Sequence, residues 1–224
     1  MRYYPLNEIF QTLQGEGHFS GMPAIFIRLQ GCPVGCSWCD TKHTWEKAPI
    51  NQVHREAILL KNAASSCWAN LKEEEIIEMI LKQAWTARHV VITGGEPCLY
   101  NLMPLTDTLE LCGFTCQIET SGTQTVQCTL KTWVTLSPKI NMRGGLPLLT
   151  QALSRSDEIK YPVSRQRDID ELDTLLQSIK DEKKRIIALQ PVNRKEIATR
   201  LCIATCIARN WRFSMQMHKY LNIV

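Results

Sequence analysis

Short β-forming runs alternate with helical patterns along most of this chain, and this alternation limits the possible folds more than any other feature. Strands are predicted over residues 24–29, 89–93, 115–120, 132–136, 158–161, 185–189 and 211–216. Apolar residues at helical spacing predict helices over 73–85, 102–111, 169–179 and 195–209. Strands joined by helical crossovers form a largely parallel sheet, so the predicted fold class is α/β.

The length of the chain indicates one domain. With 224 residues and 44% hydrophobic content, it can bury one large core. We therefore predict a single domain over residues 1–224. The polar, poorly patterned stretch at about 43–72 is predicted to be an insertion or a lid.

Polar segments follow the predicted strands. They are Thr93-Gly94-Gly95-Glu96-Pro97, Glu119-Thr120-Ser121-Gly122, Ser137-Pro138-Lys139, Gln190-Pro191 and His218-Lys219. The carboxyl ends of parallel strands share one edge, where barrel enzymes build their active sites. The Gly-Gly-Glu-Pro segment lacks a phosphate-binding frame. Its Glu96 is expected to offer a negative charge to a ligand that carries an ammonium group.

Three cysteines lie in the loop that follows the 24–29 strand. Cys32, Cys36 and Cys39 have the spacing C-x3-C-x2-C, and the next cysteine is Cys67. A [4Fe–4S] cluster is usually held by four thiolates, so three leave one iron open to a ligand that is not protein. The alternatives are a zinc site completed by His43, or three buried and inert cysteines. Structural zinc ligands usually come from two separated turns, which favours the iron–sulfur cluster.

Composition narrows the partners and the compartment. The net charge is only +4 and no basic block is present, so nucleic-acid binding is not indicated. No apolar run approaches the ~20 residues of a membrane span, and the N-terminus lacks a signal-peptide core. Ten cysteines without such a signal favour a reducing compartment, and we expect the cytoplasm. The other seven cysteines are expected to be buried, with an auxiliary cluster as the alternative.

The cysteine spacing together with Gly-Gly-Glu-Pro resembles the radical S-adenosylmethionine (SAM) superfamily. Further segments resemble the 7-carboxy-7-deazaguanine synthase family: residues 10–17, 26–32, 38–41, 119–122, 137–139 and 216–221. That family converts 6-carboxy-5,6,7,8-tetrahydropterin to 7-carboxy-7-deazaguanine with loss of ammonia, through a 5′-deoxyadenosyl radical, on the route to queuosine. The resemblance implies an incomplete, modified radical-SAM (β/α) barrel that works as a homodimer, with flavodoxin as the reductant.

The resemblance also implies roles for individual residues. The cluster ligands are Cys32, Cys36 and Cys39. The residues around SAM are Trp38, Cys39, Asp40, Gly95, Ser137, Pro138, Lys139 and Gln190. The pterin-binding residues are Leu13, Gln14, Gly15, Glu16, Arg28, Thr93 and His218, of which Glu16, Arg28 and His218 are the predicted catalytic residues. Mg²⁺ is implied as a further cofactor, with Thr41 as its ligand, in keeping with the preference of this ion for oxygen.

Two other functions are compatible with three cysteines. One is a radical-SAM activase that installs a glycyl radical on a partner protein, and the other is a non-catalytic zinc or iron–sulfur module. The activase does not explain the segments Leu13–Gly17 and His218–Leu221, and the module does not explain polar groups after six strands. The final residues, His218 to Val224, are expected to close one wall of the substrate pocket.

Overall fold

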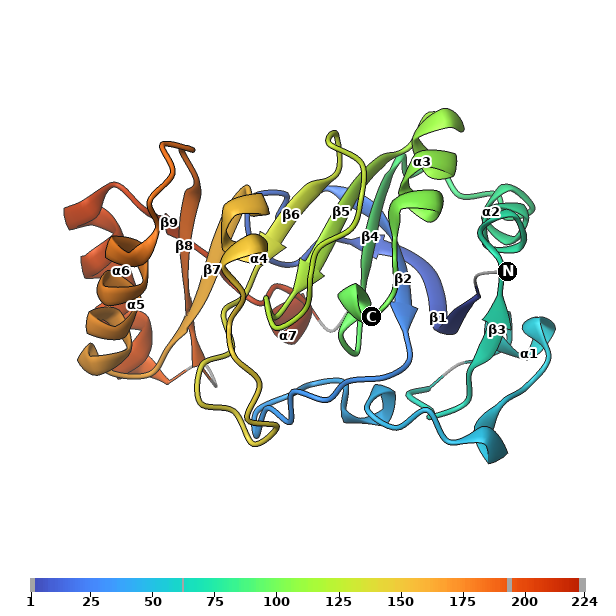
Figure 1. The fold of residues 1–224 in the computed structure, drawn as a ribbon, viewed down its shortest axis with the longest axis horizontal. Coiled ribbons are helices and arrows are strands. Elements are labelled where there is room, and N and C mark those ends of the chain that lie inside the picture. Colours follow the sequence, from blue (N-terminus) through green and yellow to red (C-terminus); the bar gives the residue numbers. More distant parts are fainter. Residues whose placement is uncertain (1–2, 62, 193–194, 222–224) are drawn as a thin grey trace.

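The computed structural model describes residues 3–61, 63–192 and 195–221. Within them one sheet forms from β1 (Tyr4–Leu13), β2 (Pro23–Leu29), β3 (Ala69–Leu71), β4 (His89–Gly94), β5 (Thr115–Thr120), β6 (Trp133–Leu136), β7 (Glu158–Val163), β8 (Ile186–Pro191) and β9 (Arg212–Phe213). The strand order is β3-β1-β2-β4-β5-β6-β7-β8-β9 (Figure 1). In this part of the chain β3 and β9 end the sheet without pairing to each other, so the barrel is incomplete, as predicted.

All pairings from β2 through β9 are parallel, which confirms the largely parallel sheet. Two pairings are antiparallel, β1 with β2 and β1 with β3. Neither β1 nor β3 was predicted from the sequence. The polar–apolar alternation that identifies a strand is incomplete in β1. The polar residue Asn7, for example, is buried and hydrogen-bonded to Gln30.

The helices follow the predicted ranges with some corrections. They are α1 (Arg55–Leu59), α2 (Glu73–Leu81), α3 (Met103–Leu111), α4 (Thr150–Arg155), α5 (Gln166–Ser178), α6 (Glu196–Arg209) and α7 (His218–Leu221). Helix α2 ends four residues earlier than predicted, and α4 was not predicted. The last strand was predicted over 211–216 but is limited to β9, and the run after it is the helix α7. Residues 222–224 of the predicted tail lie outside the described residues.

The stretch 43–72 is better ordered than its polar pattern indicated. It holds the short helices η1 (Lys42–Thr44, which begins just before it), η2 (Pro49–Asn51) and α1, and it ends in β3. The pairing of β3 with Tyr4–Leu6 ties its far end to the sheet. That the stretch 43–72 is an insertion or a lid stays a prediction, with its far end fixed to the sheet.

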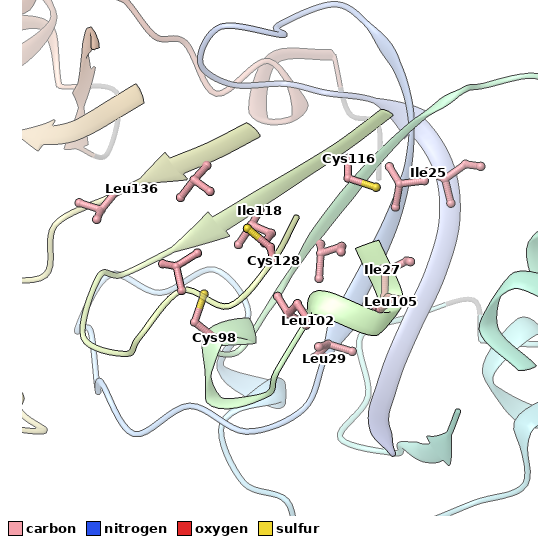
Figure 2. Close-up of a cluster of buried hydrophobic side chains, with 14 of the residues drawn as sticks. Ile25, Ile27, Leu29, Cys98, Leu102, Leu105, Cys116, Ile118, Cys128 and Leu136 are labelled. Atoms are coloured by element: carbon pink, nitrogen blue, oxygen red, sulfur yellow. The ribbon is translucent and has the colours of Figure 1, made fainter. Parts of the chain in front are cut away.

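The alternation of side chains along the strands separates a core from a cavity. Ile25, Ile27 and Leu29 of β2 are fully buried and pack in one cluster with Leu102 and Leu105, at the start of and within α3 (Figure 2). The intervening residues of β2 belong to the opposite face. Cysteines outside the cysteine loop also lie in this cluster: Cys98, Cys116, Cys128, Cys202 and Cys206. Their burial among aliphatic side chains fits the prediction that they are inert. The expectation that all seven are buried is wrong for Cys67, which is half-buried, and for Cys112, which is exposed.

No helix in the described ranges is long and apolar enough to cross a membrane.

Candidate active site

A cavity of about 910 Å³ opens at the carboxyl ends of the parallel strands. Most of the predicted site residues line it: Leu13, Gln14, Gly15, Glu16, Arg28, Cys36, Trp38, Cys39, Asp40, Thr41, Thr93, Ser137, Lys139, Gln190 and His218. Cys32, Gly95 and Pro138 do not line it. Cys32 and Gly95 instead lie where the cysteine loop meets the segment after β4, and Pro138 is buried. Sequence positions more than 200 residues apart therefore share one cavity.

The cysteine loop, Gly31 to Thr41, is held against the segment after β4 by backbone contacts. The amide of Gly95 donates to the carbonyl of Leu29 (2.8 Å), and that of Glu96 donates to the carbonyl of Gly31 (2.8 Å). A Cβ atom on Gly95 would lie 2.1 Å from the Gly31 oxygen, so no other residue fits there without displacing the backbone. This explains why the second glycine of Gly-Gly-Glu-Pro is required although it does not reach the cavity.

Glu96 does not have the role that the sequence indicated. Its side chain is buried, and its carboxylate accepts hydrogen bonds from the Cys98 amide (3.0 Å), the Thr120 hydroxyl (2.6 Å) and the Ser121 amide (2.8 Å). The Ser121 hydroxyl is a fourth donor, so the acceptor sites of this carboxylate are filled by protein groups, and Glu96 does not line the cavity. The prediction that Glu96 meets a ligand ammonium is wrong, and Glu96 instead ties the end of β5 to the turn after β4.

The two ends of the chain meet at the cavity. The Met217 amide donates to the Gly15 carbonyl (3.0 Å), and a Cβ on Gly15 would lie 3.3 Å from the backbone nitrogen of His218. Gln216 donates to Glu16 Oε1 (2.9 Å), and Lys219 forms an ion pair with Asp40 of the cysteine loop (2.9 Å). The segment 216–219 therefore joins the Leu13–Glu16 segment to the cysteine loop.

Arg28 stands on the wall formed by β1 and β2. Its Nε lies 2.9 Å from Glu8 Oε2, and its guanidinium carbon lies 5.3 Å and 5.8 Å from the centres of the Phe10 and Phe26 rings. Those two rings stack on each other, with centroids 5.6 Å apart. A guanidinium oriented in this way is suited to meet a carboxylate. The sequence did not indicate Glu8 or the two rings.

Glu16, Glu119 and Lys160 form a further group of charged side chains at the cavity. Of these, Glu119 and Lys160 were not predicted as site residues. Lys160 Nζ donates to Glu16 Oε2 (2.6 Å) and to Glu119 Oε2 (2.7 Å). Lys160 and Glu119 line the cavity together with Glu16. The signal that could have found Lys160 is a charged residue in the middle of a predicted buried strand.

The two carboxylates around Lys160 differ in acidity. Burial by itself would raise the pKa of Glu16, but the Lys160 charge, with hydrogen bonds from Lys160 and Gln216, lowers it to about 2. Burial raises the pKa of Glu119 to about 7, because it outweighs the lowering effect of Lys160 and acts together with the nearby Glu16 charge. The pair around Lys160 thus consists of one ionised carboxylate and one that titrates near neutral pH.

Comparisons with known proteins agree with this geometry. The radical SAM superfamily model matches residues 26–132. The 7-carboxy-7-deazaguanine synthase of Escherichia coli K12 is 64% identical, over 98% of this chain and 99% of that protein. That of Buchnera aphidicola is 52% identical over 99% of each. The crystal structure of QueE from Escherichia coli has a TM-score of 0.94 and 64% identity, and the match covers 96% of this chain and 94% of that one.

This chain belongs to the 7-carboxy-7-deazaguanine synthase family. It is a radical SAM enzyme, and membership in that superfamily implies a [4Fe–4S] cluster and SAM. The expectations for fold, family and enzyme class are therefore confirmed. The roles of the individual site residues stay predictions.

The residues of the cysteine loop fit such a cluster. Cys39 Sγ accepts hydrogen bonds from the Thr41 amide (3.4 Å) and from Trp45 Nε1 (3.3 Å), the kind of donors that surround cluster sulfurs. His43 lies 3.6 Å from Glu8, not among the cysteines. This geometry disfavours the alternative zinc site.

Proposed function

We propose that the chain converts 6-carboxy-5,6,7,8-tetrahydropterin to 7-carboxy-7-deazaguanine with release of ammonia. The observation that carries the proposal is the single cavity in which the cysteine loop, Arg28 and the Glu16–His218 junction meet. When bound, the cluster and SAM supply a radical that abstracts hydrogen from the substrate. The residues of this chain bind and orient the two ligands around that reaction.

The assignments to the pterin side rest on charge. Arg28 would pair with the substrate carboxylate, since a guanidinium binds a carboxylate through two parallel hydrogen bonds. Glu16 is ionised at neutral pH and would accept N–H groups of the pterin. His218 and Thr93 line the same cavity and would complete the wall, together with Leu13, Gln14 and Gly15.

The assignments to the SAM side involve residues after β4 and β6, near the end of β8 and in the cysteine loop. Lys139 Nζ donates to the Ser137 hydroxyl (2.5 Å), and burial lowers the pKa of this lysine. Gln190 accepts a hydrogen bond from Ser214 (3.0 Å), which fixes its amide. The other residues proposed around SAM are Trp38, Cys39, Asp40, Gly95 and Pro138. Cys32, Cys36 and Cys39 would hold the cluster.

Magnesium belongs to the proposal through Thr41. Its hydroxyl donates to the Gly94 carbonyl (3.2 Å) and lines the cavity, so its oxygen lone pairs are available there. Mg²⁺ commonly takes few protein oxygens and completes its shell with water and substrate. We also propose a homodimer, flavodoxin as the electron donor and a cytoplasmic location. These three points rest on the family resemblance and on the cysteine usage described above.

The deciding experiment measures SAM cleavage and product formation by the anaerobically reconstituted protein. With a chemical reductant and the carboxypterin, we expect deazaguanine product in step with consumption of the pterin. The control omits the pterin, and a second control substitutes a glycyl-radical protein partner. Product formation that does not depend on the pterin would contradict the proposal.

A further inference from the structure

Glu16, Glu119 and Lys160 form one wall of the cavity, which we call the carboxylate wall. Only 6% of the Lys160 side chain is accessible, and its ammonium contacts both carboxylates. Both carboxylates are also held from their other oxygen. Gln216 donates to Glu16 Oε1 (2.9 Å), and Gln117 donates to Glu119 Oε1 (3.0 Å). Each carboxylate is therefore fixed in orientation by at least two donors, and Lys160 is the one they share.

The three residues come from separate parts of the fold. Glu16 lies in the loop after β1, Glu119 is near the end of β5, and Lys160 is in β7. Strands β5 and β7 are separated by β6, so no backbone pairing joins Glu119 to Lys160. The ammonium contacts both glutamates directly, and Gln14 adds a longer link, because its side chain donates to Glu119 Oε1 (3.4 Å) and accepts from the Glu16 amide (3.1 Å). Without the ammonium, two buried carboxylates would lie close together with no cation between them, which is destabilising.

We propose that Lys160 is a positioning residue that holds Glu16 and Glu119 side by side so that both accept N–H groups from the pyrimidine edge of the pterin. That edge carries an exocyclic amino group and a ring N–H, two adjacent donors that match two adjacent acceptors. Carboxylates recognise the donor edges of nucleobases in the same way. The inference deepens the proposed function and rests on it.

Binding of the pterin should depend on pH through Glu119. An acceptor carboxylate must be ionised, and Glu119, with a pKa of about 7 set mainly by burial, changes charge near neutrality. Binding of the pterin should therefore strengthen as the pH rises through about 7. Other ionisable groups also face the three residues: Arg28 from β2, Asp40 from the cysteine loop, Lys139 after β6, Glu158 of β7 and His218 of α7. Because Lys160 also acts on Lys139, loss of the midpoint in Glu119→Gln is what distinguishes Glu119 from these groups.

The test measures binding of 6-carboxypterin, which keeps the same edge and carboxylate, to cluster-loaded enzyme by equilibrium dialysis from pH 6 to 9. In Lys160→Met we expect affinity at pH 7.5 to fall by about tenfold or more, because hydrogen bonds to charged groups are lost. Loss of the cation also raises the pKa of both carboxylates, so the midpoint should move up by at least about one pH unit. Glu119→Gln should remove the midpoint near 7.

Two further variants keep the result interpretable. Lys183→Met removes another ion-paired lysine, whose Nζ lies 2.7 Å from Asp157 and which does not line the cavity, and it should bind the pterin like the wild type. Lys160→Arg keeps the charge but changes the shape of the donor, so the midpoint should stay near 7 while affinity falls severalfold. If Lys160→Met does not fold, Lys160→Arg decides the question.

Wild-type affinity and an unmoved midpoint in folded Lys160→Met would overturn the inference, as would wild-type affinity in Lys160→Arg. Turnover by the wild-type enzyme separates this outcome from failure of the proposed function. If the wild type converts the tetrahydropterin and the Lys160 variants bind normally, only the positioning role is wrong. If the wild type binds no carboxypterin and forms no product, the proposed function and the inference built on it both fall.

Discussion

The cysteine loop and the carboxylate wall, formed by Glu16, Glu119 and Lys160, face the same cavity but are built in different ways. The loop takes its functional groups from eleven neighbouring residues, and its shape depends on local hydrogen bonds such as those to Cys39 Sγ. The wall takes its three groups from positions 41 to 144 residues apart, joined through one ammonium. A contiguous site can be identified from spacing, whereas an assembled site becomes visible only when the strands are placed.

The comparison predicts that the loop is needed for the cluster and the wall only for the pterin. Replacing Cys32, Cys36 or Cys39 by Ala should abolish bound iron and all SAM cleavage, because three ligands leave none to spare. The measurement is iron content and SAM cleavage after anaerobic reconstitution. Cys202→Ala, a fully buried cysteine of α6, is the control and should keep both. Loss of iron in that control to the level of Cys36→Ala would mean that the loop is not the only cluster site.

On the substrate side, Arg28→Ala should reduce affinity for the carboxypterin by about tenfold or more, since a charged hydrogen-bonded contact is lost. Iron content and SAM binding should be unchanged. The control is pterin without the carboxylate, whose binding should be affected much less. Equal losses of affinity for the two ligands would show that Arg28 supports the structure of the pocket and does not contact the substrate carboxylate.

His218→Ala should act in the same direction with a smaller loss of a few fold, because a neutral hydrogen bond contributes less than a charged one. Burial lowers the pKa of His218, so the imidazole is neutral at pH 7.5. Affinity for the pterin and iron content are measured together. Unchanged affinity and turnover would remove the C-terminal segment from the site.

The dependence of turnover on Mg²⁺ tests the role proposed for Thr41, which belongs to the cysteine loop and lines the cavity. Turnover by chelator-treated enzyme should rise severalfold on addition of Mg²⁺, whereas iron content should not change. Thr41→Ala should weaken this stimulation, and Thr174→Ala, an exposed threonine of α5 that does not line the cavity, serves as the control. The same turnover with and without added Mg²⁺ would exclude the proposed role of Thr41.

The smallest expected effect is that of replacing Glu96, and it concerns stability rather than ligand binding. Glu96→Gln keeps the shape of the side chain but weakens hydrogen bonds from Cys98, Thr120 and Ser121, so the free energy of unfolding should fall by about 1–3 kcal/mol. Thermal unfolding of the cluster-free protein measures this loss. Pterin affinity should be unaffected in the loaded enzyme. A large loss of ligand binding without loss of stability would return Glu96 to the site.

Much of the fold was predictable from the sequence because its signals are local. The runs that became β2, β4 and β5 are apolar and bounded by Gly or polar residues, and the cysteine spacing lies within one loop. Strand β3 was missed because three residues carry almost no pattern, and its only support is pairing with β1. The helix α7 was not predicted, since four residues cannot show helical periodicity.

For the site, the amino-acid sequence by itself determined the kind of chemistry, through three thiols in one loop and polar residues after buried strands. Only the tertiary structure decided which of those residues reach the cavity. Glu96 and Glu119 each follow or end a buried strand, yet Glu96 is consumed by protein donors while Glu119 shares Lys160 with Glu16. The reason is physical: the environment of a buried charge depends on partners that are distant along the chain, and those partners are set by the packing of the strands.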